Sequence, residues 1–257
     1  MVEALGRKLI LVGQEVHDFA SLLVSAFWSS LTPPFRLRET LQQLSFVAWE
    51  SAPVVLLSVS FAAAVTIMEA SFHMKIVVQN DSLVPGFAAL LILRELGVVV
   101  TALLVTSRVG AGYAAEVGSM QITEQVEALK MLGIHPIRYL LVPRLYASIL
   151  GLMILTVVAN MVCIYVAMLV SQWSLGYSSG SFLMAMRAFV GLQDLLFSVI
   201  KAGVFGAVIP IYSIFFGLRC RAGAEGVGLA TTSAVVATSV TIIILDFILS
   251  YIFSFFY

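Results

Sequence analysis

The stretch between Arg144 and Arg187 sets the class of this protein, because it contains no Asp, Glu, Lys or Arg. An α-helix needs only about 20 apolar residues to cross the roughly 30 Å hydrocarbon core of a bilayer, so this stretch is longer than one span requires. Of the 257 residues in the chain, 61% are hydrophobic and 11% are charged, and the mean hydropathy is +1.05. This composition excludes a soluble globular domain and a disordered chain, and it predicts an all-α integral membrane protein.

Five segments are apolar and long enough to span the membrane. The long uncharged stretch contains Gln172 and a run of turn-forming residues from Gly176 to Gly180, so we expect the third span to end there. The expected spans cover about residues 52–73, 82–107, 139–171, 195–218 and 226–257.

The distribution of Lys and Arg predicts the orientation of these spans. Only Lys75 and Arg187 lie in the loops after the first and third spans. Ten others lie before the first span or in the loops after the second and fourth spans: Arg7, Lys8, Arg36, Arg38, Arg108, Lys130, Arg138, Arg144, Arg219 and Arg221. Since cytoplasmic loops carry the excess of positive charge, we expect the N-terminus in the cytoplasm and the C-terminus outside.

The first thirty residues carry one apolar stripe at steps of three and four, typical of an amphipathic helix. The stripe consists of Leu5, Leu9, Val12, Val16, Phe19, Leu23 and Phe27. A signal peptide has a shorter segment that is apolar all round, so we expect instead a helix that lies in the cytoplasmic leaflet and ends at Thr32-Pro33-Pro34. An ordinary packed amphipathic helix fits the same pattern.

Several classes of function are disfavoured by what the sequence lacks. Fourteen Lys and Arg balance fourteen Asp and Glu, so no basic field favours nucleic acid. Cys163 and Cys220 lie in different settings and form neither a CxxC motif nor a metal cluster, which predicts no disulfide and no metal site. No Gly-Lys dipeptide occurs, so the chain has no P-loop, and a partner must bind and hydrolyse any ATP.

The segment from Gly176 to Gly180 spells G-x-S-x-G, the nucleophile elbow of many hydrolases. That motif requires a strand-to-helix turn and an oriented histidine. His17, His73 and His135 all lie in other segments, so we interpret the motif as a turn between helices and keep an intramembrane hydrolase only as an alternative.

Charged residues within the spans are the strongest candidates for a site, because such residues are costly in a membrane and are usually paired or functional. Arg94 and Glu95 lie in the middle of the second span and Glu69 near the end of the first. Lys201 lies in the fourth span and Asp246 in the fifth. The sequence allows two interpretations, namely internal ion pairs that fix helix packing and a polar patch that lines a substrate cavity.

The loop after the second span contains a short amphipathic segment from Thr123 to Gly133. We expect a helix here, capped by Thr123 and ended by Gly133 and Pro136. A short charged helix on a membrane chain without an ATPase suggests a docking element for a motor subunit. A solvated connecting helix is the alternative.

Seven stretches of the chain, in this order, resemble the MlaE (YrbE) permeases, the membrane subunits of ABC-type phospholipid transporters that work with MCE-domain proteins. The stretches are Leu93–Gly97, Ser107–Gly118, Thr123–Gln125, Gly133–Arg138, Val142–Arg144, Gly223–Thr232 and Leu245–Phe247. The resemblance implies an N-terminal interfacial helix over residues 1–34 and a permease domain over residues 35–257.

The resemblance also implies the partners and the location. It implies a homodimer in the bacterial inner membrane, with two copies of an ABC ATPase subunit that binds ATP, a periplasmic MCE-domain hexamer, and phospholipid as the cargo. It leaves open a small cytoplasmic STAS-type subunit. Thr123–Gly133 matches the helix that couples such permeases to the ATPase, and the expected contacts are Glu124, Gln125, Glu127, Lys130 and Met131.

By the same resemblance, Arg94, Glu95, Lys201 and Asp246 are intramembrane polar positions of the family. We expect a lipid cavity between two copies, lined by Ala62, Val65, Met68, Glu69, Leu96 and Val99. Two positions depart from the family pattern: Val98 replaces a proline, which predicts a straighter second span, and Glu69 replaces a glutamine, with Lys75 as a potential partner. A conventional ABC importer permease for another substrate is the nearest alternative, since Glu127-Ala128-Leu129 followed by Gly133 partly matches the coupling loop of importers.

Overall fold

The computed structural model describes residues 2–31, 36–77, 83–221 and 223–256, with the side chains of residues 2–12, 31 and 75–77 left aside. All regular secondary structure in this part of the chain is helical, which confirms the predicted all-α class. The helices are α1 (Val2–Leu31), α2 (Leu37–Ala48), α3 (Ala52–Val77), α4 (Val84–Leu91), the π-helix η2 (Ile92–Val100), α5 (Thr101–Val105), the π-helix η3 (Thr106–Gly110), α6 (Ala111–Ile122), α7 (Gln125–Met131), α8 (Pro136–Leu175), α9 (Ser179–Phe189), α10 (Leu192–Leu218) and α11 (Gly223–Ser254).

Within the described residues, five helical segments are long and apolar enough to cross a membrane, as predicted. They are Leu37–Met74, Val84–Ile122, Pro136–Leu175, Leu192–Leu218 and Gly223–Ser254. Four of the five begin before the residue expected from the sequence, because helices continue past the apolar region into charged segments. The first, for example, includes α2, with Arg38 and Glu39, ahead of the apolar helix α3.

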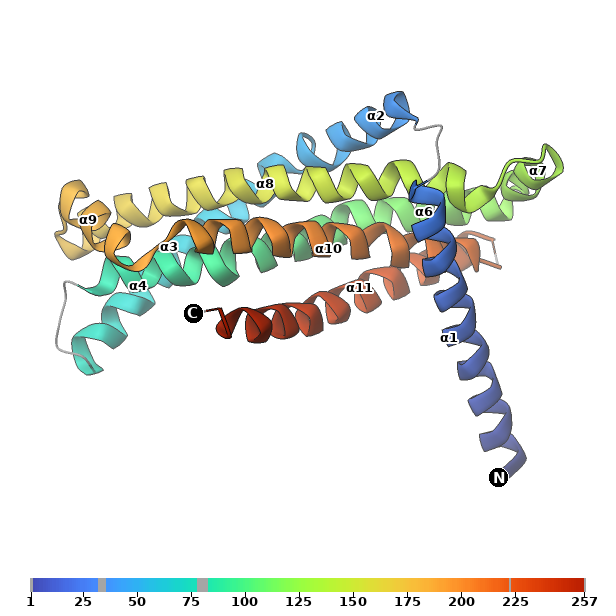
Figure 1. Ribbon diagram of the computed structural model, residues 1–257, viewed down its shortest axis with the longest axis horizontal. Helices are drawn as coiled ribbons and strands as arrows, with labels where there is room; N and C mark the ends of the chain where they lie inside the picture. The colour runs from blue at the N-terminus through green and yellow to red at the C-terminus, as the bar shows by residue number, and fades with distance from the viewer. Residues whose placement is uncertain (1, 32–35, 78–82, 222, 257) are drawn as a thin grey trace.

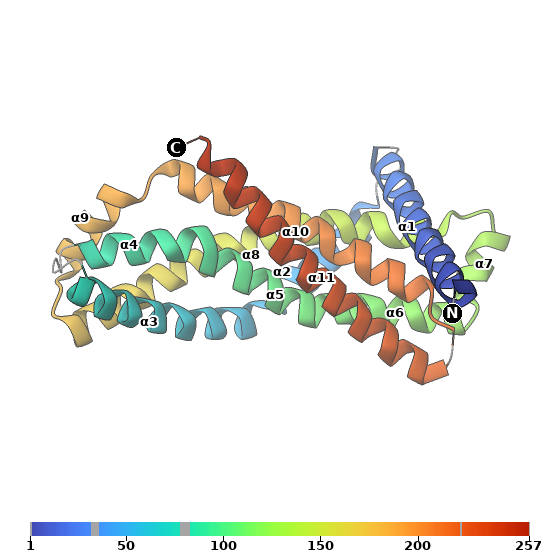
Figure 2. The same ribbon diagram turned by 90° about the horizontal axis from the view of Figure 1, so that it is seen from below.

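The long helices run side by side along the long axis of the molecule (Figure 1). Helix α8 packs against α10, α3 and α2, and α10 also packs against α11 and α6. Helix α7 lies at one end of the molecule and α9 at the other, and we refer to these as the α7 end and the α9 end (Figure 1). Helix α11 crosses the bundle obliquely, and α1 lies across the α7 end (Figure 2).

The break after the third span is a turn between two helices. Gly176 caps α8 with φ +75°, a backbone conformation that glycine adopts at little cost. Ser178 then caps α9, since its hydroxyl accepts a hydrogen bond from the Ser181 N–H at 3.1 Å. The turn is where the sequence predicts it, whereas helix α9 was not predicted.

The second span is continuous from Val84 to Ile122 but is not a uniform α-helix. It contains π-helical turns in η2 and η3, a form that is rare and frequent at functional sites. Val98, the residue that replaces the family's proline, lies within η2. Arg94 and Glu95 lie in the same π-helical segment, so its irregular backbone sets the direction in which their side chains point.

Helix α10 approaches the backbone of α8 closely at Gly206. A Cβ atom added to Gly206 would lie 2.6 Å from the backbone oxygen of Ser148 and 2.9 Å from the Cα of Ile149. A second glycine of α10, Gly203, lies one turn away, and a Cβ added there would lie 3.4 Å from the Sδ of Met153. Helix α10 thus contacts the backbone of α8 at Gly206 but only a flexible side chain at Gly203. Glycines and other small residues let membrane helices pack this closely.

We expect Gly206→Ala to lower the midpoint of thermal unfolding in detergent by several degrees, because an overpacked backbone contact costs about 1–3 kcal/mol. Gly203→Ala is the matched control on the same helix. It should leave the midpoint unchanged or raise it slightly, since alanine favours the helix by up to about 1 kcal/mol over glycine. Equal midpoints for the two variants would contradict the close approach at Gly206.

Candidate functional site

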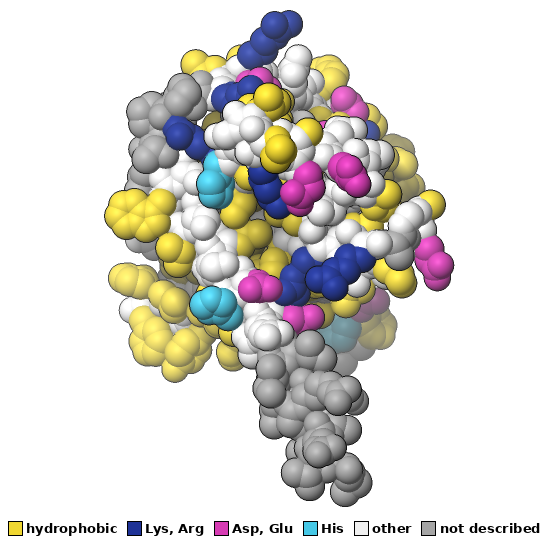
Figure 3. Space-filling view, turned by 90° about the vertical axis from the view of Figure 1, so that its right-hand side faces the viewer, with side chains coloured by type: hydrophobic (Ala, Val, Ile, Leu, Met, Phe, Trp, Pro, Cys, Tyr) yellow, Lys and Arg dark blue, Asp and Glu magenta, His cyan; other side chains and the backbone are white. Residues whose placement is uncertain are grey.

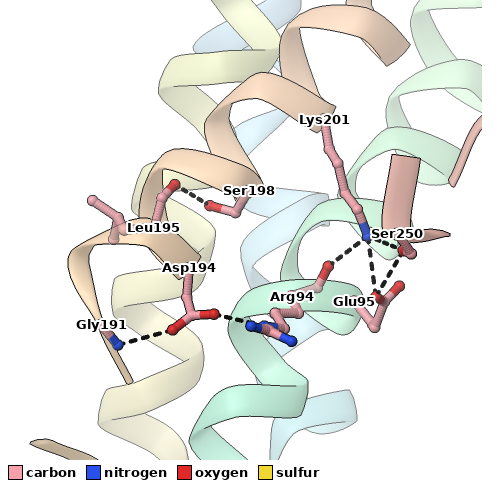
Figure 4. A network of polar contacts seen from close by, with 8 residues as sticks. All are labelled: Arg94, Glu95, Gly191, Asp194, Leu195, Ser198, Lys201 and Ser250. Atoms are coloured by element: carbon pink, nitrogen blue, oxygen red, sulfur yellow. Dashed lines mark hydrogen bonds and ion pairs between the residues drawn. The ribbon is translucent and has the colours of Figure 1, made fainter. Parts of the chain in front are cut away.

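Three helices bring five charged residues of the spans together toward the α9 end of the molecule. Helix η2 contributes Arg94 and Glu95, α10 contributes Asp194 and Lys201, and α11 contributes Asp246. We call these five residues the charge cluster. Figure 4 shows all of them except Asp246, together with Ser250 of α11 and other residues of the polar network.

The ammonium group of Lys201 is the centre of the charge cluster. The Nζ atom lies 2.7 Å from Asp246 Oδ1 and 3.1 Å from Glu95 Oε1, so one cation pairs with two carboxylates. It also donates hydrogen bonds to the backbone oxygen of Arg94 at 3.0 Å and to Ser250 Oγ at 2.8 Å. Lys201 is only 3% exposed. A buried charge of this kind is tolerated because partners surround it.

A second ion pair joins Arg94 to Asp194. Arg94 Nε lies 2.6 Å from Asp194 Oδ1, and Asp194 is 1% exposed. The other carboxylate oxygen of Asp194 accepts a hydrogen bond from the Gly191 N–H at 2.8 Å, at the start of α10. The sequence reasoning missed Asp194. An acidic residue at the start of an apolar helix, where it can cap the N-terminus, was the signal that could have identified it.

The charge cluster borders a cavity of about 210 Å³. The described residues that line it come from η2, α10 and α11: Arg94, Glu95, Phe197, Lys201, Ser250, Phe253 and Ser254. Two aromatic side chains and five charged or hydroxyl-bearing side chains therefore meet in one small space within the bundle. The two interpretations of the intramembrane charges are compatible, since the same residues form ion pairs and line a cavity.

The lipid-contact candidates on α3 lie apart from this cavity. Val65 and Met68 are 59% and 54% exposed, and they belong to an outward-facing stripe with Leu57, Phe61 and Phe72. Glu69 is also exposed, and its Oε2 lies 3.6 Å from His73 Nδ1. The side chain of Lys75, which the sequence suggested as its partner, lies outside the described residues.

The remaining lipid-contact candidates are more buried. Ala62 is half-buried on α3. Leu96 and Val99 of η2 are half-buried and pack against the hydrophobic core. The six candidates thus occupy two neighbouring elements of one chain, since α3 packs against η2.

The short helix α7 is exposed. Charged and histidine side chains gather on the surface at this end of the molecule (Figure 3). Glu124, Gln125, Glu127, Lys130 and Met131 are all exposed, and Met131 is 89% exposed. Val126 is buried and anchors the helix to the bundle. Lys130 Nζ pairs with Glu127 Oε1 of the same helix at 3.0 Å.

The prediction that Thr123 caps this helix is wrong. The Thr123 hydroxyl donates to the backbone oxygen of Ser119 at 2.9 Å, which completes α6 instead. The residue before α7 is Glu124, whose φ of 60° makes the sharp turn between the two helices. The predicted end of the helix is confirmed, since Gly133 has φ +72°.

The G-x-S-x-G segment does not form a nucleophile elbow. It connects α8 to α9, so the strand that the elbow requires is replaced by a helix. Ser178 is engaged as the cap of α9, and Ser179 Oγ accepts a hydrogen bond from the side chain of Gln172. The segment is therefore a turn between helices, as predicted, and the motif on which the hydrolase alternative was based is not formed.

We expect Lys201→Met to destabilise the protein by about 3 kcal/mol or more, because it leaves the carboxylates of Glu95 and Asp246 without their cation. Lys130→Met is the matched control, since Lys130 forms an exposed pair worth about 1 kcal/mol or less. Thermal unfolding in detergent measures both. Adding Glu95→Gln and Asp246→Asn to Lys201→Met should recover part of the loss. A Lys201→Met protein as stable as Lys130→Met would refute the central role of Lys201.

Comparison with known proteins gives a consistent assignment. The family described as Permease MlaE matches residues 40–252. A probable ABC transporter permease protein of Rickettsia felis is 34% identical over 253 residues, which cover 98% of this chain and 97% of the relative. The intermembrane phospholipid transport system permease protein MlaE of Haemophilus influenzae is 33% identical over 247 residues, which cover 93% and 94% of the two chains. The resemblance drawn from the sequence motifs is thus confirmed, and the chain belongs to the MlaE family of ABC transporter permeases.

Proposed function

We propose that two copies of this chain form the membrane channel of a transporter that moves phospholipid between the bacterial inner membrane and a periplasmic MCE-domain hexamer. Two copies of a separate ABC ATPase subunit supply the energy, and this chain carries no ATPase site of its own. The N-terminus and the α7 end face the cytoplasm, and the C-terminus faces the periplasm. A small STAS-type subunit is a further cytoplasmic partner in this proposal.

The observation that carries the proposal is the charge cluster beside a cavity within the bundle that two phenylalanines also line. A phospholipid has a charged head group that is costly to move through hydrocarbon, so its carrier needs polar groups at membrane depth. Arg94, Glu95 and Lys201 present such groups next to Phe197 and Phe253. The cavity of about 210 Å³ is small, so it suits a head group with the acyl chains outside it. The name of the Haemophilus relative supports phospholipid as the cargo.

The acyl chains have a suitable surface on the neighbouring helices. Val65 and Met68 lie on the outward-facing stripe of α3, and Leu96 and Val99 lie on η2, against which α3 packs. Helix α4, which leads into η2, packs against both α3 and α9. A second copy facing this surface would enclose it, with Ala62 and Glu69 at its border.

Helix α7 is suited to bind the ATPase because it is exposed at the proposed cytoplasmic end. Met131 supplies an apolar anchor, and Glu124, Gln125, Glu127 and Lys130 surround it with polar groups. Interfaces commonly combine a buried apolar anchor with a polar rim.

Helices α6 and α8, which precede and follow α7, can transmit a movement of α7 to the charge cluster. Glu116 of α6 and Arg144 of α8 form an ion pair of 2.7 Å, and Arg144 also donates to the backbone oxygen of Leu140. This contact ties the two helices together beside α7. Helix α8 then runs for 40 residues, about 60 Å at 1.5 Å per residue, to the α9 end. The span that contains α6 leads back to η2, so ATPase closure at α7 would displace Arg94 and Glu95.

We expect native mass spectrometry of the complex, purified gently from its own membranes, to show two copies of this chain, two ATPase subunits, six MCE subunits and retained phospholipid. Phospholipid binds because the cavity and the α3 surface are matched to its two ends. Recovery of the chain without ATPase and without lipid would contradict the proposal. A bound soluble solute in place of phospholipid would favour a conventional importer.

We expect Met131→Asp to weaken the association with the ATPase at least tenfold, because a desolvated carboxylate replaces the apolar anchor. Met184→Asp is the matched control, since Met184 is 77% exposed on α9 at the opposite end. Co-purification of the ATPase from membranes measures both variants. Loss of the ATPase from both, or from neither, would contradict α7 as the docking helix.

A further inference from the structure

A second and larger cavity, of about 670 Å³, lies at the α7 end between α2 and the start of α8. We call it the α2–α8 groove. Its walls come from Ser29 near the end of α1, from Leu37 and Thr40 of α2, from the linker Gly133–His135, and from the first four turns of α8. It is separate from the charge cluster, which lies toward the α9 end, and the transport route proposed above does not use it.

The groove changes from charged to apolar along α8. Arg36, His135 and Arg138 lie where α2 and α8 begin, and Val142 and Leu150 lie further along α8. Arg138 and Leu150 are twelve residues apart, which corresponds to about 18 Å along a helix. No charged residue follows Arg144 on α8, so Leu150 lies at hydrocarbon depth while Arg138 lies near the membrane surface.

The groove also contains two tyrosines, a residue type that is common where a protein crosses the membrane interface. Along α8, Tyr139 lies between Arg138 and Val142, and Tyr146 lies between Val142 and Leu150. The Tyr146 hydroxyl donates to the backbone oxygen of Ser30 at 2.8 Å, which joins α8 to the end of α1. An occupant of this groove therefore needs a polar head at the interface and an apolar chain below it.

The charge at the mouth of the groove is positive. Among the described residues that line it, Arg36 and Arg138 are the permanently charged ones, and none is acidic. The Arg36 guanidinium lies 4.1 Å from the centre of the Tyr139 ring, which holds it at the mouth. Glu39 Oε1 lies 3.6 Å from Arg36 Nη2 but does not line the groove, so it offsets part of the Arg36 charge from outside.

We propose that the α2–α8 groove binds one anionic phospholipid from the membrane leaflet at the α7 end, with its phosphate between Arg36 and Arg138 and an acyl chain along Val142 and Leu150. Two arginines match a head group of net negative charge better than a zwitterionic one, whose own cation they repel. A soluble partner would not reach Leu150 at hydrocarbon depth. The site holds a lipid that stays with the protein, and it does not depend on which lipid is transported.

The test measures binding of phosphatidylglycerol and phosphatidylcholine to the full-length chain in mild detergent by native mass spectrometry. We expect phosphatidylglycerol to bind at least about fivefold more tightly than phosphatidylcholine, the factor that one arginine near a membrane surface contributes. Arg36→Gln and Arg138→Gln should each remove most of this preference and lower the number of retained phosphatidylglycerol molecules by one per chain. Arg138→Lys should keep the preference, because it retains the charge.

Arg38→Gln is the matched control, since Arg38 is exposed two residues from Arg36 and does not line the groove. It should leave binding unchanged. Equal binding of the two lipids, or an equal loss in Arg38→Gln, would overturn the proposal in favour of general surface charge. Loss of the preference in Arg138→Lys as well as Arg138→Gln would show that Arg138 is needed for structure only. Displacement of the lipid by glycerol 3-phosphate would indicate a site for soluble anions and would also overturn it.

Discussion

The ammonium group of Lys201 lies inside the membrane-spanning bundle, where a charge without partners would cost several kcal/mol. Its partners come from two other helices, η2 and α11, so the positions of these two helices and of α10 are constrained together. The constraint matters most for α11, since its buried residues are few: Ala230, Ala234, Thr238 and Ile242. Asp246 and Ser250 bind the C-terminal half of α11 to η2 and α10. The few buried apolar residues of α11 would by themselves give only a weak packing contact there. The cluster thus fixes the helix that closes one side of the candidate cavity.

The same cluster depends on the irregular backbone of the second span. Arg94 and Glu95 are consecutive residues, yet Arg94 pairs with Asp194 and Glu95 pairs with Lys201, on the same helix α10. Each of the two helices carries one cation and one carboxylate, and each pair joins the cation of one helix to the carboxylate of the other. A shift of either helix would therefore break both pairs at once. The two ion pairs therefore favour one register of η2 against α10 and disfavour the registers next to it.

Much of the fold follows from the sequence because the relevant signals are local. The absence of charge between Arg144 and Arg187 predicts a long apolar helix, and Gly133 and Gly176 predict where helices end. The pairing of charges does not follow, because Arg94 and Asp194 are 100 residues apart in sequence and meet only through helix packing. Helix α9 was missed because its eleven residues are too few to span a membrane and follow a turn signal. Thr123 was misassigned because a threonine can serve as the cap of one helix or complete the previous one, and the left-handed backbone of Glu124 decides between them.

The two polar sites lie at opposite ends of the same long helices, and the segment that joins them to the proposed ATPase is short. Gly133, Ile134 and His135 connect the end of α7 to α8 and also form part of the wall of the α2–α8 groove. A lipid in that groove would contact the linker through which α7 moves α8. The position of these three residues would therefore depend both on the ATPase bound to α7 and on the lipid taken up from the adjacent leaflet. Since α8 begins at this linker, a movement there would be passed on toward the α9 end. In this proposal one linker carries both contacts, so lipid binding in the groove and movement of α7 would affect each other.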